Sequence, residues 1–207
     1  MKISRAAIRL PFIMSAALFL TGCLAPETIN ADITTEGYDY TLRVESTVAD
    51  PRAVMAAAEG RLTEQDDEGA RRMAANDADM PGFERFEYVG EGRFELVVNH
   101  AGTLEADRGV GFPNTRGGLR NDNYLRLERL DDGTIEISSP EIPAQNLAQH
   151  EELPFEPAGT VRITPAPTDR VLDHNADRSP AMLDRAYVWN VDSWEDRIFI
   201  KIVPQGQ

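Results

Sequence analysis

The strongest constraint on the fold is a series of short strand patterns separated by glycine turns. Residues 38–45 alternate between apolar and polar side chains, with Tyr38, Tyr40, Leu42 and Val44 forming the apolar row. This period of two predicts a strand with one apolar face. A preceding strand from Glu27 is expected to turn back at Thr35-Glu36-Gly37, where glycine allows a positive φ.

Two further segments have the pattern of antiparallel hairpins. Residues 83–89 and 93–98 flank Gly90-Glu91-Gly92, and residues 124–130 and 134–138 flank Asp131-Asp132-Gly133. Strand-like runs around such turns predict hairpins. Strands are also expected at 160–164, 185–191 and 197–203. The last is apolar on both faces, as in a buried central strand. Residues 171–180 have the composition of a polar turn region.

The helical part of the chain follows the first two strands. Asp50 and Pro51 suit the N-cap and first position of a helix. We expect helices at 51–61 and 64–77, the second with an imperfect capping box between Thr63 and Asp66. The predicted fold class is α+β: a mainly antiparallel sheet built from hairpins, with one or two helices (about 51–77) packed on one face. The apolar row of residues 38–44 is expected to face these helices.

The N-terminus has the features of an export signal. Lys2, Arg5 and Arg9 precede an apolar run at 11–20, which is shorter than the roughly 20 residues of a membrane span. The run ends at Leu20-Thr21-Gly22-Cys23, which resembles the bacterial lipobox. That resemblance implies that Cys23 carries a diacylglycerol and becomes the mature N-terminus. An ordinary cleaved signal is the alternative, but it does not require cysteine at this position.

These features divide the chain into a lipoprotein signal peptide (1–22), a short tether (23–26) and a single α+β domain (27–207). Cys23 is the lipidation site that the lipobox resemblance implies, and it is the only cysteine, so the fold is expected to rely on packing rather than on disulfides. Leu24 stands where the inner-membrane retention signal of lipoproteins usually has aspartate. The resemblance therefore implies a lipid anchor in the outer membrane, facing the periplasm.

The mature chain would be strongly acidic. Residues 1–22 contain three of the 21 Lys and Arg and none of the 35 Asp and Glu, which leaves a formal charge of −17. Such a surface repels nucleic-acid phosphates, so no nucleic-acid partner is expected. The partners expected are the membrane, through acylated Cys23, and either a lipid ligand or an envelope protein.

No motif assigns a catalytic, cofactor-binding or metal-binding residue. The three histidines, His100, His150 and His174, are scattered, and no base–nucleophile arrangement is recognisable. We therefore expect no enzyme activity, cofactor or metal. His150-Glu151-Glu152 lacks a second nearby histidine for zinc, and Ser179 stands too close in sequence to His174 and the Asp173/Asp177 pair to form a triad.

Three other segments have simple structural explanations. The acidic run at 65–68 suits the first turn of a helix. Arg108, Arg116 and Arg120 could bind an anion, but local carboxylates can also neutralise them. Residues 105–122 and 139–158 are expected to be the least ordered parts of the domain.

The order of segments resembles a group of uncharacterised proteobacterial lipoproteins. The similarity lies in the lipobox, Pro81-Gly82-Phe83, the hairpin at 88–95, Gly159-Thr160-Val161, and Asn175-Ala176-Asp177 before Tyr187-Val188-Trp189. A more distant similarity is to the mycobacterial LppM-like lipoproteins, which implies an α+β domain that handles hydrophobic or lipid ligands. These motifs carry no binding residue.

Two non-catalytic functions remain open from the sequence. In the first, the sheet and helices enclose an apolar pocket for a lipid or another hydrophobic ligand. In the second, the core is solid and the domain works through its surface as an interaction or structural module.

Overall fold

The computed structural model describes residues 24–79, 82–106, 108–112, 124–142, 147, 150–182 and 184–205. Cys23 and the predicted signal peptide lie outside these residues. Arg116, Arg120 and much of the segments 105–122 and 139–158 also lie outside them. Anion binding or charge pairing by these arginines, and the low order expected of these segments, therefore stay predictions.

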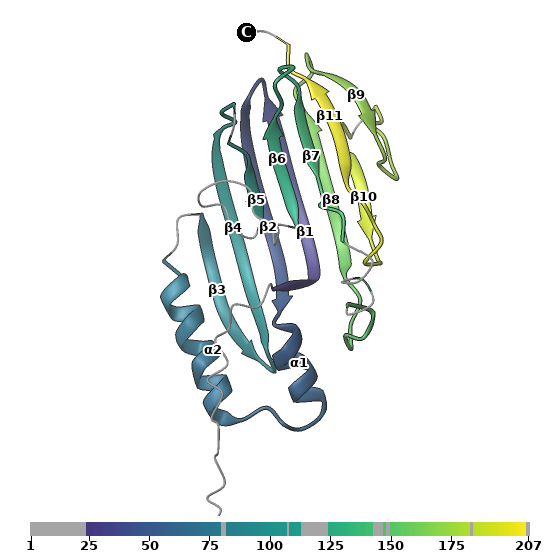
Figure 1. Ribbon diagram of the computed structural model, residues 1–207. Coiled ribbons are helices and arrows are strands. Elements are labelled where there is room, and N and C mark those ends of the chain that lie inside the picture. The colour runs from purple at the N-terminus through teal and green to yellow at the C-terminus, as the bar shows by residue number, and fades with distance from the viewer. Residues whose placement is uncertain are drawn as a thin grey trace, which may run out of the picture.

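A six-stranded sheet forms one layer of the molecule. Its strand order is β10-β8-β1-β2-β4-β3, and all neighbours are antiparallel except β1 and β8, which are parallel. The first two strands form a long hairpin at its centre (Figure 1). The strands are β1 Ala25–Glu36, β2 Asp39–Ala49, β3 Phe83–Gly90, β4 Arg93–Thr103, β8 Ala158–Pro165 and β10 Tyr187–Val191.

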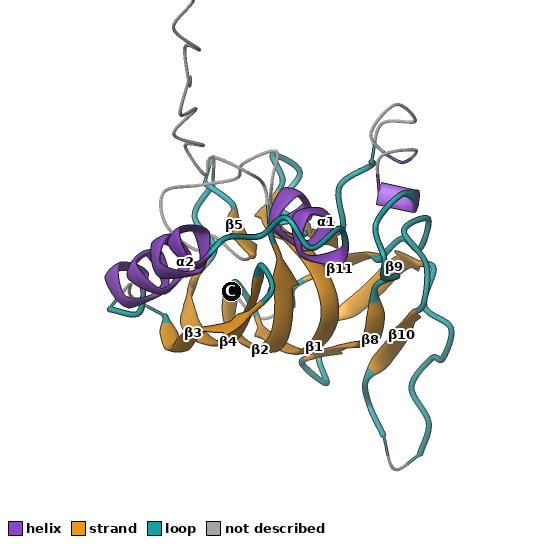
Figure 2. Ribbon diagram, turned by 90° about the horizontal axis from the view of Figure 1, so that it is seen from below, coloured by secondary structure: helices purple, strands orange, loops and turns teal. Residues whose placement is uncertain are grey.

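A five-stranded antiparallel sheet forms the second layer. Its order is β5-β6-β7-β11-β9, and the two sheets lie face to face (Figure 2). Its strands are β5 Val110–Phe112, β6 Leu125–Arg129, β7 Ile135–Ser138, β9 Arg170–His174 and β11 Phe199–Val203. As predicted, the last strand is central, between β7 and β9. The prediction of a polar turn region at 171–180 is wrong for 171–174, which belong to β9.

Two helices lie at one end of the sandwich (Figure 1). Helix α1, Pro51–Ala58, begins at the Asp50 cap, whose carboxylate accepts hydrogen bonds from two backbone N–H groups. Helix α2, Glu64–Asp77, begins with a complete capping box between Thr63 and Asp66. It packs on β3, and its buried residues are Ala70 and Ala74. The α+β class, the mainly antiparallel sheets and the two helices are therefore confirmed.

The core is shared by both sheets and α2. Buried side chains from all three form one continuous cluster, including Leu42 and Phe94 of the six-stranded sheet and Ile137 of the other. The row at 38–44 points into this core, but the second sheet covers it at Tyr38: the Tyr38 hydroxyl donates to the Gly133 carbonyl, and the Arg129 guanidinium lies 3.8 Å from the ring centre. The expectation that helices cover this row is wrong there, because the sequence pattern did not reveal a second sheet.

Candidate functional site

The folded structure begins immediately after the predicted lipidation site. Leu24 is half-buried and packs on the core, and Ala25 is buried and pairs with Ala49 at the end of β2. Strand β1 therefore already includes residues 25 and 26, which the sequence suggested as tether. Any lipid on Cys23 is attached one residue from the edge of the core.

The end of the sandwich next to this attachment point is built by α1 and the β3–β4 turn. The Asp50 backbone N–H donates to the Gly92 carbonyl at 2.8 Å, which fixes the turn to the start of the helix. Gly92 has φ +78°, and a Cβ there would lie 2.5 Å from the Ala53 Cβ. The turn glycine thus serves two purposes: it permits the backbone conformation and lets α1 approach closely.

A groove of about 380 Å³ opens between α1 and residues 152–153. Pro51, Met55, Ala56 and Leu153 make its wall mostly apolar, and Arg52, Arg61 and Glu152 add charged groups. Sequence reasoning missed this groove because about one hundred residues separate its two walls. No local pattern links Met55 to Leu153.

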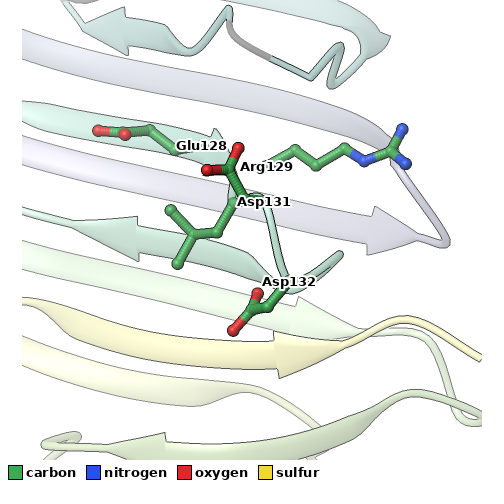
Figure 3. Close-up of a pocket in the computed structure, with 5 residues that line it drawn as sticks. Glu128, Arg129, Asp131 and Asp132 are labelled. Carbon is green, nitrogen blue, oxygen red and sulfur yellow. The ribbon is translucent and has the colours of Figure 1, made fainter.

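A second depression, of about 450 Å³, surrounds the β6–β7 turn (Figure 3). Glu128, Arg129, Asp131 and Asp132 line it, but their side chains point in different directions rather than toward one centre. Hydrogen bonds from Thr134 and Lys201 lower the pKa of Asp132 to about 2. Asp132 therefore stabilises its own turn and an ion pair at 3.0 Å to Lys201.

His100 forms a partly buried pair with Tyr40. The Tyr40 hydroxyl and His100 Nδ1 share a hydrogen bond at 2.8 Å, and the rings stack with centroids 5.7 Å apart. Burial raises the pKa of Tyr40 to about 12, so its hydroxyl stays protonated at neutral pH. His100 thus has a tyrosine hydroxyl as its hydrogen-bond partner within the sheet.

Replacing His100 with glutamine should weaken the acid sensitivity of folding. Burial lowers the pKa of His100 below its ordinary 6.5, so below that pH the unfolded chain binds a proton more readily than the folded one. Between about pH 7 and pH 5, the unfolding free energy of the wild type should therefore fall further than that of His100→Gln. Urea denaturation at both pH values measures the two losses. An equal or larger loss in the variant would contradict the assignment.

The residues around His174 form a structural junction rather than a triad. The Asn175 side-chain oxygen accepts hydrogen bonds from Trp189 Nε1 at 2.7 Å and from the Phe199 N–H at 2.9 Å. Its amide nitrogen donates to the Arg197 carbonyl. Asn175 therefore joins β10 of one sheet to β11 of the other. Asp177 accepts from the Asn190 N–H.

The remaining candidate residues lie in structural contacts. The acidic run at 65–68 is in the first turn of α2, as predicted, with Asp66 in the capping box and Asp67 accepting a hydrogen bond from the Tyr88 hydroxyl. The His150 ring lies 4.8 Å from the Trp194 ring. Arg108 is exposed, and its backbone pairs with that of Glu105 in an isolated antiparallel β-bridge.

Within the described ranges, no three His, Cys, Asp or Glu side chains are grouped so that they could hold a metal ion. No helix in the same part of the chain is long and apolar enough to cross a bilayer. Comparison with models of known protein families, and separately with curated proteins, found no match to this chain.

Proposed function

We propose that this protein is a non-catalytic lipoprotein of the cell envelope. Acylated Cys23 holds it in the outer membrane on the periplasmic side, and the sandwich acts through its surface as an interaction or structural module. The proposal joins the lipobox-like sequence at 20–23 with a domain whose apolar interior is occupied by its own side chains.

The single observation that favours a surface function over an internal ligand site is the hydrophobic core that the two sheets share. Leu42, Phe94 and Ile137 are each no more than 1% exposed, and they belong to one cluster that spans both sheets. A lipid carried between the sheets would need a mostly apolar cavity of roughly 300 Å³ or more. Side chains from both sheets meet in this space, which favours a packed sandwich.

Changing Cys23 to alanine should release the protein from membranes. A diacylated cysteine provides two chains, each contributing about 0.8 kcal/mol per buried methylene, and the variant has none. In detergent phase partition, the wild type should enter the detergent phase and Cys23→Ala the aqueous phase. Circular dichroism of both proteins checks that the domain is folded. Partition of both into the aqueous phase would refute the lipid anchor.

The soluble Cys23→Ala protein also separates the surface module from an internal lipid carrier. Purified from a bacterial envelope, it should give a native mass equal to that of the polypeptide alone. A retained lipid, lost when a core residue is enlarged, would instead support the carrier.

A further inference from the structure

The path of the chain fixes which end of the sandwich can lie at the membrane. Consecutive Cα atoms are about 3.8 Å apart, and paired strand residues about 5 Å. Since Ala25 pairs with Ala49 and α1 starts at Pro51, Cys23 can be no more than about 20 Å from Pro51. The opposite end, at the β1–β2 turn, is separated from Ala25 by the whole of β1, about 35 Å.

The same end carries the apolar groove. Met55 and Leu153 are half-buried on its two walls, and Pro51 places it beside the start of α1. Apolar side chains with cationic groups at the rim are typical of surfaces that rest at the boundary between headgroups and acyl chains. Here Arg52 and Arg61 are exposed and line the groove, although Arg61 also pairs with Glu59.

We propose that the α1 end of the sandwich rests on the phospholipid bilayer, with the groove between α1 and residues 152–153 turned toward the lipid. This orientation rests on the proposed function, because the lipid on Cys23 brings that end to the surface. Leu24, the residue that follows Cys23, already packs on the core, so the described part of the chain adds no length between the anchor and the folded domain.

Negative charge on helix α2 means that this end of the domain needs the lipid anchor to stay at the membrane. The first turn of α2 contains Glu64, Asp66 and Asp67, which repel anionic headgroups. The apolar groove must therefore act together with the acyl chains of Cys23, and the Cys23→Ala protein should not bind vesicles.

Site-specific labels on the acylated full chain can test the orientation. Lipidation consumes the only native thiol, so an introduced cysteine is the only one that reacts with a maleimide fluorophore. Met55→Cys reports on the groove, Arg61→Cys on its exposed rim, and Glu36→Cys on the far end of β1. Each protein is placed in vesicles of phosphatidylethanolamine with a minor share of phosphatidylglycerol, with and without headgroup-labelled nitroxide lipid.

We expect about twofold quenching at positions 55 and 61, and little at position 36, which lies about 35 Å from Ala25 at the other end of β1. If a label at position 55 disturbs packing, the label at position 61 still reports on the groove, because Arg61 is exposed. The orientation would be overturned, and the anchor left intact, if the protein floated with the vesicles but quenching differed from this pattern. Quenching only at position 36, equal quenching at all three positions, or no quenching would each be such a result. Failure of the acylated protein to float would instead refute the proposed function.

Discussion

Replacing Gly159 with alanine is expected to destabilise the domain by more than about 3 kcal/mol. Gly159 has φ +148° and pairs with Ile29 in the parallel ladder between β1 and β8. A Cβ at this position would lie 1.8 Å from the Ile29 carbonyl oxygen and 2.7 Å from its carbon. Backbone, not a flexible side chain, occupies that space, so the two strands would have to separate. Urea unfolding of the soluble Cys23→Ala form, followed by circular dichroism, measures the loss.

Gly69 provides the matched control for this substitution. It lies in α2, where an added Cβ would meet no atom within 4 Å. Gly69→Ala should leave stability unchanged or raise it by up to about 1 kcal/mol, because alanine favours the helix. A Gly159→Ala protein within about 1 kcal/mol of its parent would show that the close approach of β1 and β8 is not needed.

The second large effect is expected at Phe94, where β3, β4 and α2 meet. Phe94 is 1% exposed, and its ring centre lies 5.4 Å from that of Phe86 and 5.2 Å from that of Tyr88. Phe94→Ala should cost about 3–5 kcal/mol, because it removes a ring from a packed core and leaves a cavity. The unfolding midpoint and slope in urea measure this cost.

Val89 is a suitable control, since it lies on β3 but is 50% exposed. Val89→Ala should change stability by less than about 0.5 kcal/mol. If Phe94→Ala lost only the α2 signal and left the sheets at wild-type stability, the helix end would be a separate folding unit rather than part of the shared core.

The local elements were predictable because their signals lie within a few residues of one another. Alternation over residues 38–45 identified β2, Asp50-Pro51 identified the start of α1, and Asp132-Gly133 identified the β6–β7 turn. The sequence did not predict strands β5 and β9, because they lack such local signals. The first is three residues long, and β9 is a short edge strand with mostly exposed side chains, so neither has a periodic pattern.

The candidate site shows the limit of sequence reasoning more clearly. The sequence predicts Cys23 as the anchor, but it does not reveal which end of the domain Cys23 adjoins. That follows from the pairing of Ala25 with Ala49 next to α1. The groove likewise depends on Leu153 lying beside Met55, a contact between distant segments.

The sequence by itself determined the hairpins, the two helices and their caps, because turns, capping and alternation depend on neighbouring residues. Only the tertiary structure decided that the strands divide into two sheets, and that β1 pairs with β8 at the far end of the chain. The tertiary structure also shows the roles of Gly159 and Asn175, which local patterns could not reveal. Gly159 leaves room for the Ile29 backbone, and Asn175 connects Trp189 to β11. Long-range pairing depends on which faces bury one another, and a single strand pattern is compatible with several partners.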